Sequence, residues 1–382
     1  MQEWTVFHAL RQAANYADII LINREDNMSY KILAINPGST STKISLYEDE
    51  KEVFTKKLDH QLEEIEKFNN VEDQLHMRKD LVMEFLKEKE FDINELSVVV
   101  ARGGMLPPVK SGAYEINDLM IDRVVNRPVM EHASNLAAPI AYEIAQEAGI
   151  PSYIYDSVMA DELPDIARIS GMPDLPRTSS SHVLNTRAMA IKASKERGKK
   201  YEEMNIIVAH LGGGISINVH EKGRIVDIVS DDEGPFSPER AGRVPCRELI
   251  NLCYSGKFDK KTMQRKLRGN GGLRAYLNTI DAREVQNMIN EGNEEARLIY
   301  EAMAYQVAKG IGELATVLEG NIDLIVLTGG IAYSSMLTDW IEKRVRFIAP
   351  VEILAGENEM EALVFGALRV LRGEETAREY TE

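Results

Sequence analysis

Hydroxyl-bearing, small and cationic residues are concentrated in a short loop near the start of this chain. The segment NPGSTSTK places Asn36, Ser39, Ser41 and Lys43 between two apolar runs that read as strands. Hydroxyls, a lysine ammonium and backbone N–H groups made accessible by a glycine are groups that bind a polyphosphate. The loop lacks the G-x-x-x-x-G-K-[ST] spacing of a P-loop and joins two strands, so a plain hairpin turn is the alternative.

A second loop repeats this arrangement. The segment HLGGGIS contains His210, Leu211, Gly212, Gly213 and Gly214 inside a strand pattern. Successive glycines weaken a strand, and they mark either a bulge or a close approach to the backbone. Because two phosphate-sized hairpins occur in one chain, we expect a duplicated nucleotide-binding fold with a cleft between its halves.

Several cations and imidazoles stand where secondary structure does not explain them. Arg102 ends an apolar strand, Arg240 and Arg243 lie in a Pro/Gly-rich loop, and His132 and His182 precede predicted helices. A strand-end salt bridge for the first arginine, and a helix cap or core position for each histidine, are the ordinary alternatives. Taken together, these side chains suit the neutralisation of a phosphoryl group during transfer.

Two further segments have both a functional and a structural interpretation. Asp156 ends the short strand SYIYD and either faces the site or caps a helix. The cluster GNGGL at 269–273 precedes a helix carrying Asp281 and Arg283. These residues either hold an adenosine or begin the helix, with Asp281 as N-cap.

The composition excludes several classes of partner. The 382 residues carry a formal net charge of −16, whereas nucleic acid and anionic membranes require a basic face. Cys246 and Cys253, the two cysteines, have neither metal-site nor disulfide-framework spacing, so we expect a reducing cytoplasm. No apolar run approaches the ~20 residues of a membrane span.

The predicted elements alternate between strand-rich units and helices. Hairpins at 31–47 and 206–219, each extended by a third strand, recur with buried strands at 97–104 and 323–330 that end in Gly-Gly. Helices are expected at 71–90, 133–148, 181–198 and 294–318. This alternation predicts an α/β protein with its ligand at the carboxyl ends of the strands. A last helix at 359–372 is expected to pack on the first half.

The N-terminal residues 1–27 lie before these elements. They contain the apolar patch ADIILI but lack a basic segment and a small-residue cleavage site, so they do not form a signal peptide. We expect a peripheral extension, with the working protein beginning at Met28. A docked amphipathic helix is the alternative, because Trp4, Phe7, Leu10 and Ala14 have helical spacing.

The motifs together resemble the acetate and butyrate kinases, a branch of the actin, hexokinase and Hsp70-like ATPase superfamily. The resemblance runs from about Tyr30 to the C-terminus. It rests on NPGSTSTK, VVVARGG, EHASNLAAPIA, YDSVMADELPDIARISG, AHLGGGIS, GPFSPER, GNGG, DAREV and VLTGGIA, in that order. It implies an α/β fold of two duplicated ribonuclease H-like (actin-like ATPase) domains with an interdomain active-site cleft. The expected domains are 28–180, joined by the C-terminal helix region 359–382, and 181–358, which binds the nucleotide.

The resemblance also implies an activity, reversible phosphoryl transfer between ATP and a short-chain carboxylate that gives an acyl phosphate and ADP. It assigns Asn36 and Glu359 to Mg²⁺. The catalytic residues that it implies are Arg102, His132, Asp156, His182 and Arg240, with Arg243 as a rival for the last. The nucleotide-binding residues that it implies are Ser39, Ser41, Lys43, His210, Leu211, Gly212, Gly213, Gly214, Asp281, Ala282, Arg283, Gly329, Gly330, Ile331 and Ala332. It further suggests a homo-oligomer.

Two departures from the acetate kinase pattern bear on this expectation. Acetate kinases read G-I-G-E-N where this chain has Gly-Gly-Ile-Ala-Tyr at 329–333, which loses polar contacts. They also read R-V-V-H-G-G where this chain has Arg102, Gly103 and Gly104. We expect the missing valines to leave room for butyrate or a branched acid. Acetate or propionate kinase activity is the alternative, and a non-catalytic actin-like ATP switch is a rival from another class.

Overall fold

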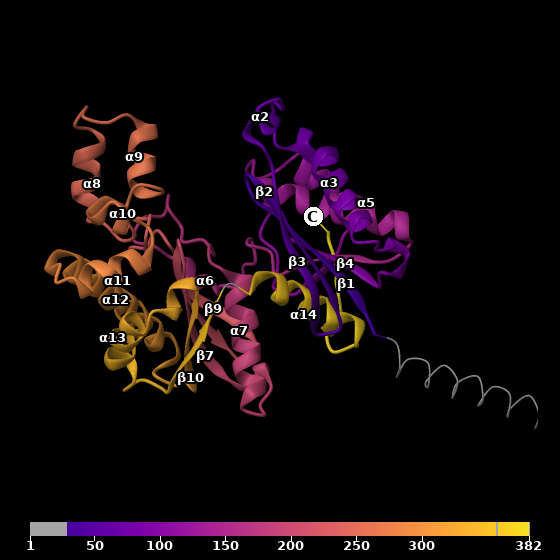
Figure 1. Ribbon diagram of the computed structural model, residues 1–382. Helices are drawn as coiled ribbons and strands as arrows, with labels where there is room; N and C mark the ends of the chain where they lie inside the picture. Colours follow the sequence, from indigo (N-terminus) through magenta and orange to yellow (C-terminus); the bar gives the residue numbers. More distant parts are fainter. Residues whose placement is uncertain (1–28, 357, 382) are drawn as a thin grey trace, which may run out of the picture.

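The computed structural model describes residues 29–356 and 358–381. The expected extension at 1–27 lies outside these residues. The described residues form two β-sheets, one in each of the two lobes in Figure 1, with helices α7 (Val183–Glu196) and α14 (Glu359–Leu371) between them. The predicted α/β class is confirmed.

The two sheets share one topology. The first has the strand order β12-β5-β6-β4-β1-β2-β3 and the second β11-β10-β7-β8-β9. In each, three antiparallel strands form a meander, one further strand pairs in parallel with its first strand, and another pairs in parallel with that strand. The first sheet contains β1 (Lys31–Pro37), β2 (Ser41–Glu48), β3 (Lys51–Asp59), β4 (Val98–Arg102), β5 (Ala113–Glu115), β6 (Ser152–Tyr155) and β12 (Arg378–Glu379). The second contains β7 (Asn205–Leu211), β8 (Ile215–Glu221), β9 (Arg224–Val229), β10 (Leu324–Gly329) and β11 (Val351–Ala355). The predicted duplication is therefore present.

Both faces of each sheet are covered, which explains the continuous apolar runs. In β1, Leu33 and Ile35 pack with residues of α3 (Leu75–Glu88) and α5 (Ala137–Ala148), while Ile32 and Ala34 pack with residues of α14. In β7, Ile207 and Ala209 pack with residues of α12 (Glu294–Ala315), while Ile206 and Val208 pack with residues of α7. Successive strand residues therefore alternate between two helical layers.

Helices α7 and α14 contact each other between the two sheets. Leu184 of α7 lies in the same cluster of buried residues as Leu363 and Val364 of α14. Since α14 comes from the end of the chain and covers the first sheet, the N-terminal lobe is completed by C-terminal residues (Figure 1). The domain boundaries proposed from the sequence stay a prediction.

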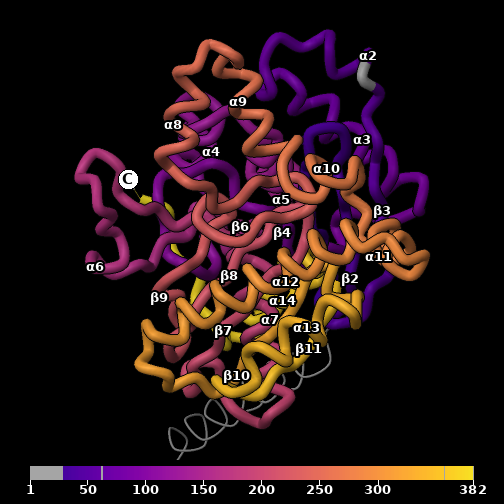
Figure 2. The backbone as a smooth tube through the Cα atoms, turned by 90° about the vertical axis from the view of Figure 1, so that its left-hand side faces the viewer, coloured from indigo at the N-terminus to yellow at the C-terminus, as the bar shows by residue number. Residues whose placement is uncertain are grey.

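The remaining helices lie around this frame. In Figure 2, α8 and α9 stand at the same end of the molecule as α2 and α3, whereas α7 and α13 lie toward the other end. These helices are α2 (Leu62–Ile65), α4 (Asp118–Val125), α6 (Asp165–Arg168), α8 (Cys246–Cys253), α9 (Lys260–Leu267), α10 (Gly272–Leu277), α11 (Ala282–Asn290) and α13 (Ser335–Val345). Short 3₁₀ turns occur at η1 (Glu72–Gln74), η2 (Ile93–Glu95), η3 (Ala133–Leu136), η4 (Tyr201–Glu203), η5 (Thr316–Leu318) and η6 (Gly330–Tyr333). None of the helices within the described residues is long and apolar enough to cross a bilayer.

Candidate active site

A cavity of about 490 Å³ opens where the two lobes meet. That volume lies within the range typical of small-molecule sites. Its wall combines the β1–β2 loop, the ends of β1 and β4, and the starts of α7 and α14. The lining residues are Asn36, Pro37, Gly38, Ser39, Ser41, Lys43, Lys57, Arg102, Met105, His132, Ser134, Val158, Ser180, Ser181, His182, Ser216, Asp231, Arg240, Arg268 and Glu359. We call this cavity the cleft.

The charge of the cleft is opposite to that of the whole chain. Its described lining contains five lysine or arginine side chains and two carboxylates, whereas the chain as a whole has a formal net charge of −16. Such a local excess of positive charge in a concave site attracts anions. The cleft is therefore suited to phosphates and carboxylates.

Residues from three elements meet at one edge of the cleft. Asn36 at the end of β1 donates a hydrogen bond of 2.7 Å from Nδ2 to Glu359 Oε2, at the start of α14. Arg102, at the end of β4, donates from Nη1 to both oxygens of Glu359, at 3.1 and 3.0 Å. For Arg102 both sequence interpretations therefore hold, because this arginine faces the cleft and also forms an ion pair.

The two histidines of the cleft are held through Nδ1. His132 Nδ1 accepts a hydrogen bond from the backbone N–H of Ser134, so a neutral ring carries its proton on Nε2. His182 Nδ1 lies 2.8 Å from the hydroxyl oxygen of Ser216. Burial, followed by nearby cations, lowers the pKa of both imidazoles, which favours the neutral form. Each Nε2 remains as the ring nitrogen available to a ligand.

The second loop supports the cleft from behind. His210 is 5% exposed, donates a hydrogen bond from Nδ1 to Oδ1 of Asn185 at 2.9 Å, and stacks on His182 with ring centroids 4.0 Å apart. Gly329, which has φ of 90°, lies so close to the backbone of Leu211 that a Cβ on it would stand 2.4 Å from that residue's carbonyl oxygen. His210 to Gly214 and Gly329 to Ala332 are not among the lining residues of the cleft, although they pack together directly behind it.

Arg240 reaches the cleft because Gly214 lacks a side chain. A Cβ on Gly214 would lie 2.4 Å from Nη1 of Arg240. Arg240 forms an ion pair with Asp231, and Arg268 donates to the same carboxylate at 2.8 Å. Arg243 instead pairs with Glu313 at 2.9 Å and lines a separate cavity beside α12. The structure thus places Arg240, and not its rival, among the cleft residues.

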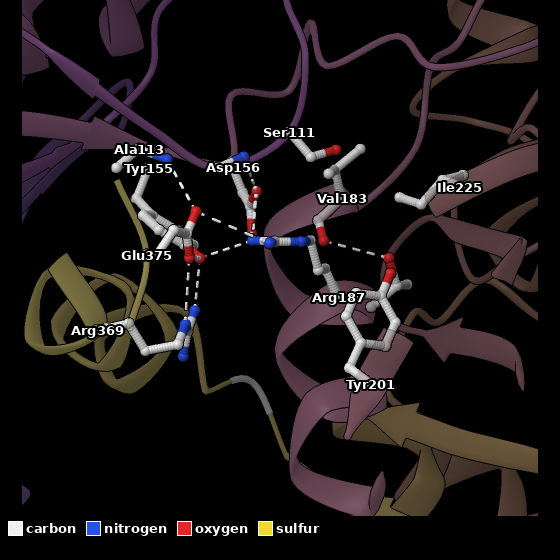
Figure 3. A network of polar contacts seen from close by, with 12 residues as sticks. Ser111, Ala113, Tyr155, Asp156, Val183, Arg187, Tyr201, Ile225, Arg369 and Glu375 are labelled. Carbon is white, nitrogen blue, oxygen red and sulfur yellow. Dashed lines mark hydrogen bonds and ion pairs between the residues drawn. The ribbon is translucent and has the colours of Figure 1, made fainter. Parts of the chain in front are cut away.

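Asp156 lies outside the cleft, in a buried network between the lobes (Figure 3). It is 2% exposed, has φ of 43°, and accepts hydrogen bonds from Arg187 at 3.1 Å and from the backbone N–H of Gly112 at 2.7 Å. Arg187 also donates to the hydroxyl of Tyr155, which in turn donates to Glu375. Burial opposes the charged guanidinium, but Asp156 and its neighbours raise the pKa of Arg187 well above its usual value. Asp156 is therefore not a helix cap; it is the carboxylate partner of a buried arginine.

Asp281 and Arg283 also lie outside the lining of the cleft. The Asp281 side chain accepts from the backbone N–H of Arg283 at 2.8 Å, and it caps α11 as the structural interpretation expected. Arg283 pairs with the same carboxylate and its side chain is 85% exposed. A polar cavity lined by residues 270–280 lies next to this helix start.

Gly103 and Gly104 have no free space where their side chains would stand, whereas the expectation that the absent valines widen the acyl pocket stays a prediction. A Cβ on Gly103 would lie 2.7 Å from Cβ of Ser157, and one on Gly104 would lie 2.9 Å from Cα of Asn135. The space beside these glycines is already filled by side-chain and backbone atoms of Ser157 and Asn135. The two glycines allow β4 to end against the segments around 135 and 157.

Comparisons with known proteins agree with this geometry. A sequence model of the acetokinase family matches residues 178–358. Butyrate kinase 1 of Clostridium acetobutylicum is 51% identical over 353 residues, which cover 92% of this chain and 99% of that protein. Butyrate kinase 2 of the same organism is 48% identical over 355 residues, covering 92% and 100%. The chain belongs to the acetokinase family.

The fold of this acetokinase-family chain also has solved counterparts. Acetate kinase of Porphyromonas gingivalis superposes with a TM-score of 0.72 at 18% identity, covering 90% of this chain and 100% of that one. A propionate kinase of Francisella tularensis gives a TM-score of 0.70 at 17% identity, covering 88% and 98%. The predicted actin-like ATPase fold is confirmed.

Sequence reasoning missed several lining residues of this acetokinase-family cleft. Asp231 and Arg268 surround Arg240, and Ser216 holds His182. The run Thr178 to Ser181 was visible before His182, and its last two serines line the cleft. For Arg268 and Asp231 the sequence offered no signal, because their roles depend on a contact between distant loops.

Proposed function

We propose that this chain is a butyrate kinase, which transfers a phosphoryl group reversibly between ATP and butyrate to give butyryl phosphate and ADP. The observation that carries the proposal is the cation-rich cleft between duplicated sheets, in a chain about half identical to butyrate kinases over 92% of its length. The named butyrate kinases are also covered almost completely, so the likeness is not limited to the nucleotide-binding half.

The carboxylate substrate needs no general base. Short-chain acids have pKa values of roughly 4–5, by analogy with side-chain carboxyls, so butyrate is already ionised at neutral pH. The protein's task is then to position the reactants and to offset negative charge. In this proposal Arg102 and Arg240 flank the carboxylate and the phosphoryl oxygens, and His182 and His132 donate hydrogen bonds through Nε2.

The nucleotide phosphates are assigned to the loop that carries Ser39, Ser41 and Lys43. The second loop, His210 to Gly214, and the segment Gly329 to Ala332 support the phosphates from the other lobe. The segment Asp281 to Arg283, beside the polar cavity at 270–280, is assigned to the adenosine. All three glycine-containing segments then contribute to one extended nucleotide site.

The residues at the edge of the cleft fit a magnesium ion. Asn36 and Glu359 carry the amide and carboxylate oxygens that Mg²⁺ prefers. Asn36 contacts Glu359 through its amide nitrogen and Arg102 donates to both carboxylate oxygens, so a bound ion would replace some of these hydrogen bonds. In the described part of the chain no group of three or more His, Cys, Asp or Glu side chains could hold a metal. This agrees with an ion bound by one or two protein groups together with substrate phosphates. Magnesium bound with the nucleotide would reduce the charge on its phosphates.

Asp156 acts in this proposal through Arg187 and not on the reactants. Its buried carboxylate accepts a hydrogen bond from Arg187 at 3.1 Å, which supports a role in orienting that arginine. Because this pair joins β6 of one lobe to α7 of the other, it supports the relative position of the two cleft walls (Figure 3).

A trap for the acyl phosphate tests the proposal. Purified protein is incubated with ATP, Mg²⁺, butyrate and hydroxylamine, and butyryl hydroxamate is measured beside ADP. We expect hydroxamate equal to ADP, and neither product without butyrate. ADP without hydroxamate would contradict the proposal and favour an ATP switch. Acetate or propionate kinase activity is the alternative, and the same trap with those acids measures it.

Location and assembly complete the proposal. Cys246 and Cys253 are exposed free thiols, which supports a reducing cytoplasm. A homo-oligomer follows from the resemblance alone, and sedimentation equilibrium tests it: a single species of 42.9 kDa would contradict it.

A further inference from the structure

A buried arginine lies behind the phosphate loop. Arg78 of α3 is 1% exposed and is not among the residues that line the cleft. Its guanidinium donates to the carbonyl oxygens of Gly38, Ser39 and Ser41 at 2.8, 3.0 and 3.3 Å. One side chain from a helix therefore holds three backbone carbonyl groups of the loop at 38–41.

This contact determines the direction of the loop's N–H groups. In a planar trans peptide the carbonyl and the following N–H point in opposite directions. When the carbonyls of Gly38 and Ser39 point at Arg78, the N–H groups of Ser39 and Thr40 point away from it. Gly38 and Ser39 line the cleft and Arg78 does not, so N–H groups that point away from Arg78 are suited to face an anion in the cleft.

The guanidinium is itself held in place by neutral groups. Gln74, at the end of η1 just before α3, accepts from Nε and Nη2 at 3.1 and 2.8 Å, and Thr42 Oγ1 lies 3.3 Å from Nη1. Thr42 also contacts the ring of His60 at 2.9 Å. This network fixes the orientation of the planar Arg78 guanidinium against the loop. A side chain without such partners would not be held in one orientation.

The positive charge of Arg78 has no carboxylate partner among the described residues. Burial lowers the pKa of Arg78 to about 10, so the side chain is still charged at neutral pH. An uncompensated buried charge is costly. An anion bound across the thin loop would offset that cost, because the loop alone separates Arg78 from the cleft.

We propose that Arg78 is a positioning residue that sets the phosphate loop for the nucleotide and supplies a second layer of positive charge beneath it. The inference rests on the proposed function, since it assigns the loop to ATP. Its effect should appear in nucleotide affinity, and the carboxylate, which is bound by other residues, should be unaffected.

The test compares Arg78→Met and Arg78→Lys with wild type and with Lys79→Gln. Lys79 is the next residue of α3 and pairs with Glu143 and Glu147, so its removal takes a positive charge from the same helix without touching the loop. The readouts are Kd for MgATP by titration calorimetry without carboxylate, and separate KM values for ATP and butyrate. Weak binding of MgATP by wild type would count against the proposed function itself, whereas the variants address Arg78 alone.

We expect Arg78→Met to raise Kd and KM for ATP by about tenfold, which corresponds to about 1.4 kcal/mol. KM for butyrate should change by less than about twofold, and Lys79→Gln should match wild type. Arg78→Lys keeps the positive charge but not the planar guanidinium with its several donors. We therefore expect its Kd for MgATP to lie between those of wild type and Arg78→Met. If Arg78→Met does not fold, the ATP affinity of Arg78→Lys decides whether the proposal holds. Unchanged ATP affinity, or equal losses for ATP and butyrate, would overturn the proposal.

Discussion

The side-chain amide of Asn36 donates a hydrogen bond of 2.7 Å to the carboxylate of Glu359, across 323 positions of sequence. This bond joins the end of the first strand to the start of the last helix. Arg102 donates to the same carboxylate, so the edge of the cleft is already organised before a ligand binds. Glu359 thus accepts hydrogen bonds from both Asn36 and Arg102, which face it from the first sheet.

Glu359→Gln should change the magnesium requirement. Removing the negative charge weakens the attraction for a divalent ion, and we expect the Mg²⁺ concentration for half-maximal activity to rise about tenfold. The measurement is a Mg²⁺ titration at fixed ATP. Glu361→Gln, on the first turn of the same helix but outside the cleft lining, is the matched control and should behave like wild type. An identical Mg²⁺ requirement in all three proteins would remove Glu359 from the metal site.

Arg240→Gln and Arg243→Gln should have very different effects on kcat. Only the first of these two side chains lies among the described cleft residues, whereas the second pairs with Glu313 at the surface. Loss of one charge-stabilising donor should lower kcat on the order of 100-fold for Arg240→Gln. Arg243→Gln should stay within about twofold. Steady-state rates of both variants give the answer, and a reversed order would exchange the roles of the two arginines.

The buried pair of Asp156 and Arg187 should contribute to stability. Asp156→Asn leaves Glu375, 3.8 Å away and shared with Arg369, as the carboxylate that faces buried Arg187, so the variant should lower the free energy of unfolding by up to about 3–5 kcal/mol. The double variant Asp156→Asn/Arg187→Met should lose less than the sum of the two single losses. Urea unfolding of the four proteins forms the cycle. Strictly additive losses would show that the two side chains do not stabilise each other.

Stability should fall in mild acid because several histidines are buried in the neutral form. Burial is the main cause that lowers the pKa of His220 to about 3, and that of His60 and His210 to about 4. The unfolded chain takes up protons on these rings as pH falls below about 6.5, while the folded chain does not, so stability decreases with falling pH. At pH 5 the loss is about 2 kcal/mol per histidine.

A variant tests this origin of the acid sensitivity. His220 lies outside the cleft, and its Nε2 has no hydrogen-bond partner within the described residues. His220→Asn should narrow the difference between unfolding free energies at pH 7 and pH 5. If the difference matched that of wild type, His220 would not be a source of the effect.

The strand framework could be predicted from sequence because both faces of each sheet are buried. Continuous apolar runs such as 98–101 and 324–327 are typical of central strands covered on both faces, and glycine-rich turns marked their ends. The two hairpins repeated each other visibly, so the duplicated fold followed. The helix starts were also recognisable: Asp281 and His132 cap the elements that follow them.

The partners of the site residues were less accessible to sequence reasoning. Arg102, His132, His182 and Arg240 were predicted to meet, and they do line one cleft. Asp156 was grouped with them, but its side chain turns toward Arg187, since positive φ at the end of β6 changes its direction. The filled space beside Gly104 depends on a neighbour 31 positions away, which no local pattern indicates. Arg78 belongs to the same class, because a buried arginine on a polar helix looks in sequence like a surface residue.

The central claim is that the cleft accepts butyrate as the carboxylate partner of ATP. The most direct measurement is kcat/KM for a series of straight and branched acids from two to six carbons at saturating MgATP, read from hydroxamate formation. The account predicts the highest kcat/KM for butyrate or a branched four- or five-carbon acid, at least about tenfold above acetate. An equal or higher kcat/KM for acetate would contradict it.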